Sequence, residues 1–239
     1  MSRTDPVGRA DPVVELWLLD AATVPVDPAA LDCLDEEERG RAARFVRVAD
    51  RTAYLAAHVA LRRVLGRRLA VAPEALAFTR EPCPDCAGPH GRPRLAGPLP
   101  GAPHFSLSHG GGRVLIGVAA APLGVDVEPL PGADAAEVLS AALHPAERAE
   151  LADVLAARRP GEFARLWTRK EAYLKGLGVG LGRPPAADYL GTADPGRRPR
   201  GWAVANVPAG PRHAAAVALR GSSTAVPHRL RHTLGRPGG

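Results

Sequence analysis

The chain has 239 residues, of which 46% are hydrophobic and 23% charged, as in a soluble globular protein large enough to bury a core. The sequence contains no run of about 18 apolar residues, so no membrane span is expected. Its N-terminus lacks the apolar core of a signal peptide, and we therefore expect a cytoplasmic protein. Three cysteines do not suggest a disulfide scaffold. The net charge of +6 indicates a surface that attracts nucleic acid, anionic cofactors or acidic proteins.

The hydrophobic pattern changes between strand-like and helix-like along the chain. Loosely alternating and β-branched residues predict strands, and apolar stripes at helical spacing predict helices. After a leader over residues 1–12, we expect a strand over 13–20, helices over 35–45 and 50–65, a Gly/Pro-rich loop or hairpin over 80–103, strands over 104–108, 113–120 and 124–128, helix within 134–159 and over 161–178, and a β-hairpin over 201–221. Asp50 is a candidate N-cap, and Gly176 and Gly178 should end the last helix.

This order of elements indicates an α+β fold made of two similar halves that meet near residue 121. The N-terminal half is expected over residues 13–121 and the C-terminal half over 122–221. Residues 222–239 are basic and poor in apolar side chains, so they should form a flexible tail. No literal internal repeat is visible.

The sequence LGVDVE carries two acidic side chains two positions apart, Asp126 and Glu128. In a strand both point to the same face, with Cα atoms about 6.6 Å apart at roughly 3.3 Å per residue. Pro129 ends the strand beside them. Two such carboxylates can converge on a hard cation such as Mg²⁺, although a solvent-facing pair on an amphipathic strand explains the same pattern.

The sequence WTRKEAYLK contains the only two lysines of the chain, Lys170 and Lys175. On a helix, Trp167, Lys170, Glu171 and Lys175 fall near one another. Glu171 and Lys175 could form a surface ion pair worth about 0.3 kcal/mol. Trp167 indicates, however, that this face is partly buried, and charged groups there need a partner, for which an ion or a phosphate is a candidate.

Other residues are candidates for anion binding. In FSLSHGGG, the end of a strand places Ser108, His109 and glycine N–H groups at one loop, which suits phosphate oxygens, although a tight hairpin turn explains the glycines equally well. Arginine suits bidentate phosphate recognition, although most arginines of so Arg-rich a chain should be solvated. The candidates are Arg44, Arg47, Arg51, Arg80, Arg92 and Arg94.

The sequence CPDCAGPH offers Cys83, Cys86 and His90 as metal ligands. A structural zinc site has four ligands in a tetrahedron, and this loop supplies three. Cys33 or His104 could provide the fourth, but nothing in the spacing indicates either. The pattern alone therefore does not establish zinc binding.

Taken together, GVDVE, a gap of 41 residues from Asp126 to Trp167, and WTRKEAYLK resemble the signature of the Sfp-type 4′-phosphopantetheinyl transferases. In that family Gly, Val or Ile, and Asp are followed after about forty residues by an aromatic residue, with Lys, Glu and Lys at the same spacing as here. The segments RFVRVADRTAYL, GRP and FSLSH match further motifs of the family. The resemblance covers about residues 40–190.

The resemblance implies two α+β halves related by a pseudo-twofold axis, with coenzyme A bound in the cleft between them. It implies transfer of 4′-phosphopantetheine from coenzyme A to a serine of an apo acyl or peptidyl carrier protein, which releases 3′,5′-ADP and needs Mg²⁺, with Mn²⁺ as an alternative. A monomer that binds neither nucleic acid nor membrane is expected. The sequence does not indicate whether fatty-acid, polyketide or nonribosomal-peptide carriers are served.

The same resemblance assigns roles to individual residues. Asp126, Glu128 and Glu171 would hold the metal at the diphosphate of coenzyme A. Glu171 would also act as the base, directly or through a water, and Lys175 would contact the diphosphate and protonate the leaving 3′,5′-ADP. The nucleotide phosphates would be bound by Arg44, Arg80, Arg92, Ser108 and His109.

Some features depart from the family pattern. Arg92 stands where Lys is commonest, Ala53 stands where Arg is frequent, and the cysteine-bearing loop is an extra segment. One alternative is a basic nucleic-acid-binding module without catalytic activity, although aromatic residues for base stacking are few. A zinc-stapled scaffold protein is another. A catalytically lapsed family member is a further alternative, against which the intact acidic residues argue.

Overall fold

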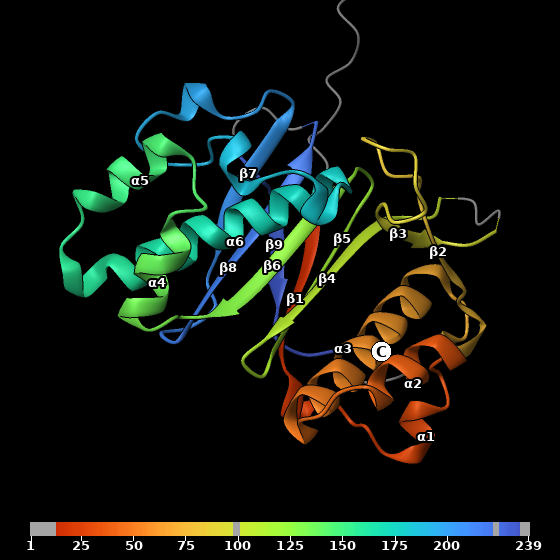
Figure 1. Cartoon of the computed structure of the whole chain (residues 1–239). Helices are drawn as coiled ribbons and strands as arrows, with labels where there is room; N and C mark the ends of the chain where they lie inside the picture. The colour runs from red at the N-terminus through yellow and green to blue at the C-terminus, as the bar shows by residue number, and fades with distance from the viewer. Residues whose placement is uncertain (1–12, 98–100, 222–224, 235–239) are drawn as a thin grey trace, which may run out of the picture.

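The computed structural model describes residues 13–97, 101–221 and 225–234, and Figure 1 shows the arrangement of its elements. The mixture of helix and strand confirms the expected α+β class. The strands are β1 (Val14–Asp20), β2 (Phe78–Arg80), β3 (Pro93–Leu95), β4 (His104–Gly110), β5 (Arg113–Ala119), β6 (Leu123–Pro129), β7 (Trp202–Val207), β8 (His213–Arg220) and β9 (His228–Arg231). The α-helices are α1 (Pro28–Leu31), α2 (Glu36–Ala43), α3 (Val48–Leu69), α4 (Ala133–Ser140), α5 (Pro145–Ala152) and α6 (Arg159–Leu177).

Two sheets form the centre of the molecule. One has the strand order β4-β5-β1-β9, with β1 antiparallel to β5 and parallel to β9. The other is antiparallel, with the order β6-β8-β7, and β2 and β3 form a separate antiparallel pair. Where β4 lies beside β6, serine hydroxyls accept backbone hydrogen bonds of the neighbouring strand: Val125 N donates to Ser106 Oγ at 3.1 Å, and Val127 N donates to Ser108 Oγ at 3.3 Å.

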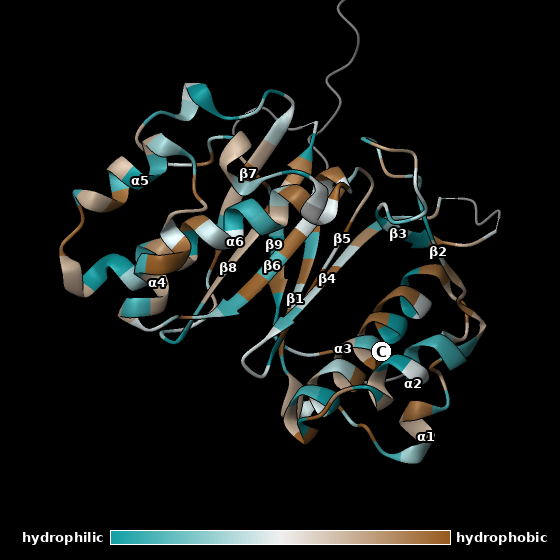
Figure 2. Cartoon of the chain, in the orientation of Figure 1, coloured by the Kyte–Doolittle hydropathy of each residue, from teal (hydrophilic) through white to brown (hydrophobic). Residues whose placement is uncertain are grey.

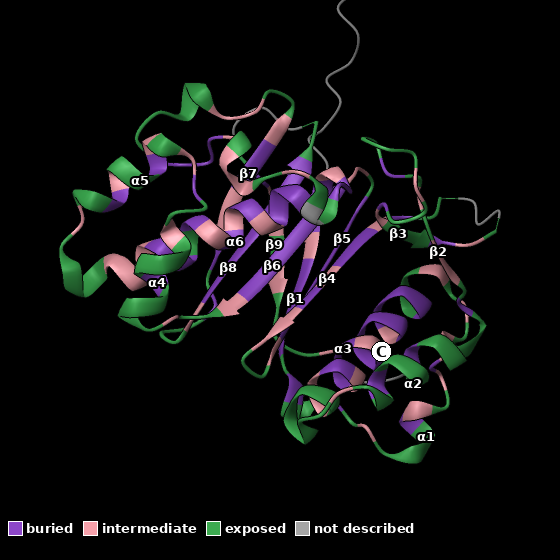
Figure 3. Cartoon of the chain, viewed as in Figure 1, coloured by how far each residue is buried: buried purple, intermediate pink, exposed green. Residues whose placement is uncertain are grey.

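The hydrophobic residues of the strands are divided between the two faces of each sheet. Leu16 of β1 and Val125 of β6 belong to a core shared by the two sheets, whereas Leu19 packs in the core under α3 and Ala216 packs in the core under α6. Figure 2 shows the hydrophobic residues concentrated on the central strands and on α3, and Figure 3 shows these strands buried while much of α2 and α5 is exposed. Each sheet thus has one long helix on its outer face. A pseudo-twofold relation between the halves stays a prediction.

Helix α6 lies very close to β6 because glycines face each other at the contact. A Cβ atom on Gly124 would lie 1.9 Å from the carbonyl oxygen of Ala172 and 2.4 Å from the backbone nitrogen of Gly176. A Cβ on Gly176 would lie 2.6 Å from the ring of Trp202. Gly176 therefore does not end the helix as expected. It lies within α6, and Gly178, with a φ of 81°, is the left-handed cap.

The predicted boundaries need three further corrections. Helix α3 begins earlier than expected, with Arg47 as its N-cap, so Asp50 lies in the first turn. The helical segment expected within residues 134–159 is divided into α4 and α5, because Pro145 starts a new helix. Within the expected C-terminal tail, residues 228–231 form β9, which pairs with β1. The pairing uses the backbone groups at the edge of β1, so it does not depend on apolar side chains in the tail.

The remaining tail residues, 222–224 and 235–239, and the leader over residues 1–12 lie outside the described part of the chain. Across the described residues, the model contains no helix that combines the length and the apolar character needed to cross a bilayer.

Candidate functional site

The candidate site is built on the face of β6 that α6 covers. Val125 and Val127 point into the core between the sheets, so the alternation of the strand puts Asp126 and Glu128 on one face, as predicted, and this face is the one that α6 covers. Asp126 is only 1% exposed. The close contact at Gly124 holds the C-terminal half of α6 directly above these two carboxylates.

From α6, Lys175 contacts the buried carboxylate of β6. Lys175 Nζ lies 2.6 Å from Asp126 Oδ1 and donates to Ser108 Oγ at 3.0 Å. Ser108 Oγ in turn donates to Asp126 Oδ1 at 2.8 Å. The structure therefore brings together Asp126, Lys175 and Ser108, which come from one helix and two strands of different sheets.

The second carboxylate oxygen of Asp126 has no partner. Asp126 Oδ2 is the buried side-chain polar atom that lacks a hydrogen bond among the residues the structure describes. Leaving such a group unpaired costs about 1–3 kcal/mol, so a role that needs a free oxygen explains why it is kept. A cation bound at this oxygen would satisfy it, and carboxylate oxygens are the donors that Mg²⁺ prefers.

The raised pKa values of the neighbouring carboxyl groups also favour a bound cation. Burial, together with the charges of Asp126 and Glu171, raises the pKa of Glu128 to about 7, although Lys175 opposes the shift. Burial and Asp126 also raise the pKa of Glu171, again against Lys175. Three carboxyl groups thus share a poorly solvated region with one ammonium group, which is an excess of negative charge that favours binding of a cation.

The three carboxyl groups do not yet form a closed metal cage. Among the described residues, only Cys83, Cys86 and His90 bring three ligand atoms within 4.8 Å of one another. The carboxylates of β6 and α6 are spread more widely than this, so joint binding of one ion would need rotation of their side chains.

The raised pKa of Glu128 makes stability depend on pH in a testable way. The folded protein holds this proton up to about pH 7, whereas the ordinary value is 4.5, so stability is lost as the pH rises through this window. In a chelator at pH 8, Glu128→Gln is therefore expected to raise the free energy of unfolding by about 2 kcal/mol, discounted for partial exposure. Urea unfolding at pH 8 and pH 5 checks this, because the gain should shrink toward zero at the lower pH. A gain that does not change with pH would contradict the assignment.

A cavity of about 350 Å³ opens beside the carboxylates, and both halves of the chain line it. Arg80 and Arg92 come from the β2–β3 hairpin, and Lys175 reaches the cavity from α6. Arg41, Tyr54 and His58, which were not predicted as site residues, also line the cavity. Its remaining polar lining includes acidic side chains and is formed by Asp35, Glu37, Glu38, Thr79, His90 and Ser106. The hollows of about 680 and 1040 Å³ found elsewhere contain none of the predicted site residues.

The other predicted phosphate-binding residues lie around this cavity in different ways. Arg44 lines a neighbouring hollow together with Arg41, one turn earlier on α2, so helical spacing from Arg44 could have identified Arg41. Ser108 is buried and directed at Asp126. His109 packs edge-on against Tyr54, with ring centroids 6.0 Å apart. Burial, and then the nearby positive groups, lower the pKa of His109, so at neutral pH it can offer a hydrogen bond but little charge.

The glycines after His109 serve the hairpin turn. Gly110 pairs with Arg113 across β4 and β5, which leaves Gly111 and Gly112 as a two-residue turn with φ values of 55° and 79°. Positive φ at both positions is the geometry that favours glycine in tight hairpins. The tight hairpin turn, and not phosphate binding, therefore explains these glycines.

Two residues of the WTRKEAYLK motif lie away from the carboxylates. Trp167 stacks on Phe163, with ring centroids 5.8 Å apart, and packs against the core of α4, α5 and α6. Lys170 is 1% exposed and forms an ion pair of 2.7 Å with Glu147 of α5. Its partner is therefore a protein carboxylate, and this lysine anchors α5 on α6.

Comparison with known proteins finds a family whose model matches the part of the chain that contains β6 and α6. The family model described as the 4′-phosphopantetheinyl transferase superfamily matches residues 122–202, which include both β6 and α6. Protein slr0495 of Synechocystis sp., which carries a provisional 4′-phosphopantetheinyl transferase name, is 32% identical over 172 residues, or 71% of this chain and 67% of its own length.

Two further relatives carry the same kind of name. A phosphopantetheinyl transferase of Thraustochytrium sp. is 32% identical over 186 residues, which cover 71% of this chain and 62% of that protein. The 4′-phosphopantetheinyl transferase psf-1 of Bacillus pumilus is 30% identical over 145 residues, which cover 61% of this chain and 58% of that protein. The chain thus spans about three fifths to two thirds of the length of these curated relatives.

These matches define a transferase. The chain belongs to the 4′-phosphopantetheinyl transferase superfamily, which confirms the family and the enzyme class expected from the motifs.

Proposed function

We propose that the protein is an Sfp-type enzyme that transfers 4′-phosphopantetheine from coenzyme A to a serine of an apo acyl or peptidyl carrier protein. The observation that carries the proposal is the contact of Lys175 with the buried, half-satisfied carboxylate of Asp126 at the edge of an arginine-lined cavity. This arrangement combines a place for a cation with a place for phosphates.

The donor set fits a divalent cation with oxygen ligands. Asp126, Glu128 and Glu171 would hold Mg²⁺, or Mn²⁺, and the free oxygen of Asp126 is the observation that supports this. When bound, such an ion neutralises charge that develops on phosphoryl oxygens.

The cavity is proposed to bind the phosphate groups of coenzyme A. It is lined by residues from Asp35 to Leu107 on one side and from Leu123 to Gly180 on the other, which supports a binding cleft between halves over residues 13–121 and 122–221. Arg80 and Arg92 line it, and guanidinium groups suit bidentate binding of phosphate. Arg80 gives one hydrogen bond within the described part of the chain, to Gly91 O, and keeps further donors for a phosphate. Arg92, by contrast, is already paired with Glu81 and donates to Gly176 O. Arg44 and His109 stay predicted contributors at its edge.

In the proposed reaction, the serine oxygen of the carrier bonds to the phosphorus that bears pantetheine, and the bond from that phosphorus to 3′,5′-ADP breaks. Glu171 accepts the proton of the serine, directly or through a water, and its raised pKa suits it to hold that proton. Lys175 faces both the carboxylates and the cavity, so it is placed to stabilise the diphosphate and to give a proton to the leaving group.

Intact mass measurement tests this proposal. The purified protein is incubated with coenzyme A, Mg²⁺ and a panel of apo acyl and peptidyl carrier proteins. Addition of one phosphopantetheine group to a carrier, with release of 3′,5′-ADP, is expected. A panel in which no carrier gains this mass, while an established transferase modifies the same carriers, would refute the proposed function.

An arginine exchange tests the assignment of the cavity. Arg80→Ala is expected to raise the KM for coenzyme A about tenfold with little change in kcat, because Arg80 contributes charge to ligand binding and lies away from the carboxylates. Arg94→Ala is the matched control, since Arg94 is an exposed arginine of the same hairpin that does not line the cavity. Equal effects of the two exchanges on KM would show that Arg80 acts only through general surface charge.

A further inference from the structure

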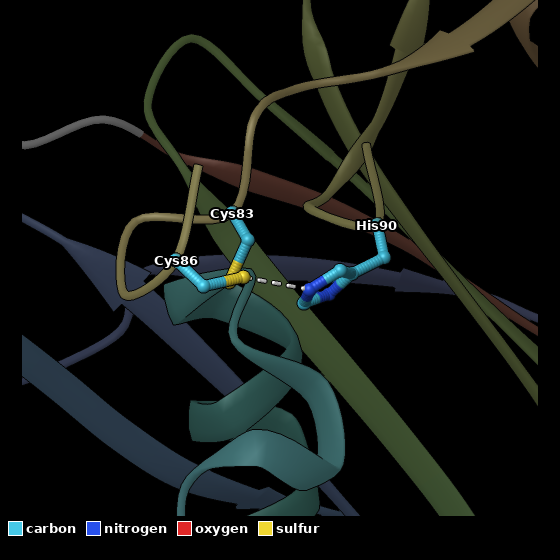
Figure 4. Close-up of side chains that lie close together, drawn as sticks. All are labelled: Cys83, Cys86 and His90. Atoms are coloured by element: carbon cyan, nitrogen blue, oxygen red, sulfur yellow. Dashed lines mark hydrogen bonds between the residues drawn. The ribbon is translucent and has the colours of Figure 1, made fainter. Parts of the chain in front are cut away.

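The loop between β2 and β3 brings together three residues that no part of the proposed reaction uses. The sulfurs of Cys83 and Cys86 and a ring nitrogen of His90 all lie within 4.8 Å of one another, and Cys86 Sγ lies 3.0 Å from His90 Nε2. Figure 4 shows the two cysteine side chains meeting, with the His90 ring facing them. Two thiols and an imidazole form a soft donor set, unlike the carboxylates of β6.

The backbone of this loop is folded so that the three side chains converge. Cys83 N donates to Gly88 O at 2.7 Å, and Ala87 N donates to Cys83 O at 2.8 Å, which closes a tight turn around Pro84 and Asp85. Ala87 has a φ of 58°, a left-handed conformation that is unfavourable for a residue with a Cβ atom. The loop keeps this strained conformation although position 87 is not a glycine. Backbone strain of this kind is concentrated at functional sites.

Gly88 leaves room for two of the ligand side chains. A Cβ atom on Gly88 would lie 3.0 Å from the His90 ring and 3.3 Å from Cys86 Sγ, so a larger residue there would displace these side chains by a few tenths of an ångström. Cys83 is only 3% exposed, so its sulfur is held in place within the turn. A thiolate is the form in which a cysteine binds a metal.

We propose that this loop binds one Zn²⁺ ion through Cys83, Cys86 and His90. Zinc bonds of about 2.3 Å to sulfur and about 2.0 Å to nitrogen place tetrahedral ligand atoms about 3.4–3.8 Å apart. The contact between Cys86 and His90 therefore needs to lengthen by only about half an ångström, and the other two separations are within 4.8 Å. The fourth position is open to water, because these three are the only suitable donors that converge here in the described part of the chain. This open position makes the site accessible to a chelator.

The site has a structural consequence for the cavity. The loop joins Arg80 to Arg92, and Arg80 Nη1 already donates to Gly91 O at 3.1 Å. Arg92 donates to Gly176 O of α6 at 2.8 Å and pairs with Glu81 at 2.6 Å. A metal that closes the loop between the two arginines therefore fixes the hairpin that carries them, and under the proposed function it improves binding of coenzyme A without entering the chemistry.

Metal content tests the site independently of any enzyme activity. The full chain is reduced, incubated with Zn²⁺, freed of loosely bound ion on a desalting column and analysed for metal by mass spectrometry. About one zinc per chain is expected, and Co²⁺ in its place should give the intense near-ultraviolet band of cobalt–thiolate bonds. In Cys86→Ser the bound zinc and this band should fall at least tenfold, whereas Cys33→Ser, which removes the cysteine outside the cluster, should keep both.

Contrary results would be equally clear. Less than about 0.1 zinc per chain in the reduced wild type, or retention of the zinc by Cys86→Ser, would overturn the proposal. A wild type that binds no zinc after reduction but forms a Cys83–Cys86 disulfide in air would overturn it in favour of a redox pair. A protein that binds zinc but modifies no carrier would leave the metal site standing and refute the proposed function.

Discussion

Glu171→Gln is expected to lower kcat for transfer of phosphopantetheine by about 10²- to 10⁴-fold while leaving the protein at least as stable as the wild type. The loss of rate follows if Glu171 accepts the proton of the carrier serine, because a general base contributes about this much to catalysis. The effect on stability has a separate cause. The pKa of Glu171 is raised by burial and by Asp126, so the carboxylate is destabilised in the folded protein and an uncharged amide avoids that penalty.

The combination of lost activity and retained stability distinguishes a catalytic role from a structural one. A residue that only supports the fold would lose both together, whereas functional residues are often held at some expense of stability. Initial rates with coenzyme A, Mg²⁺ and a modified carrier give kcat, and thermal unfolding in a chelator gives the stability. Both measurements use the same purified variant.

Glu162→Gln provides the matched control for this exchange. Glu162 lies more than two turns earlier on the same helix, is half-exposed and pairs with Arg165 one turn later. Its exchange is expected to change kcat by less than twofold. A Glu171→Gln enzyme whose kcat stays within about threefold of the wild type would remove Glu171 from the mechanism.

The sequence allowed prediction of those parts of the site that depend on local geometry. The period of two in a strand put Asp126 and Glu128 on one face, and the structure confirms the strand and its alternation. That this face is covered by α6 was not predicted. Helical spacing likewise placed Glu171 and Lys175 on one stripe of a helix. Both predictions need only the direction of side chains along one element, which a few residues of sequence determine.

The parts that the sequence did not indicate depend on contacts between distant elements. In the sequence Gly124 looks like an ordinary glycine at the start of a strand, and Gly176 like a helix cap. Only the packing of α6 on β6 shows that they let the two elements approach. Ser108 was expected to bind phosphate, yet its hydroxyl is taken up by Val127 N, Asp126 and Lys175. Such roles arise from the geometry of two or more partners, and no local pattern specifies that geometry.

The role of Lys170 also depends on a distant partner that the local sequence does not indicate. Its spacing from Glu171 and Lys175 suggested a charged cluster at a ligand, but Glu147 is its partner, with 1% and 0% of the two side chains exposed. Lys170 Nζ also donates to Asp188 O at 2.6 Å. Glu147 accepts from Leu190 N at 2.6 Å and from His144 N at 3.0 Å, so the ion pair is the centre of a buried network.

Lys170→Met is expected to lower the free energy of unfolding by about 3–5 kcal/mol. The exchange leaves Glu147 buried without its cation, and an uncompensated buried charge is among the largest single destabilising effects in proteins. Urea unfolding at neutral pH, followed by circular dichroism, measures the loss. Arg165→Met on the same helix is the control, because its exposed pair with Glu162 should contribute less than about 1 kcal/mol.

A double exchange tests whether the isolated charge causes the instability. If it does, Glu147→Gln combined with Lys170→Met should recover at least about half of the lost stability, since no charge then remains buried and the amide can still accept from Leu190 N. A loss of shape or volume at Lys170 would instead persist in the double variant. Equal instability of the single and double variants would therefore show that Lys170 supports α5 and α6 by packing, and that its charge has no part in holding them together.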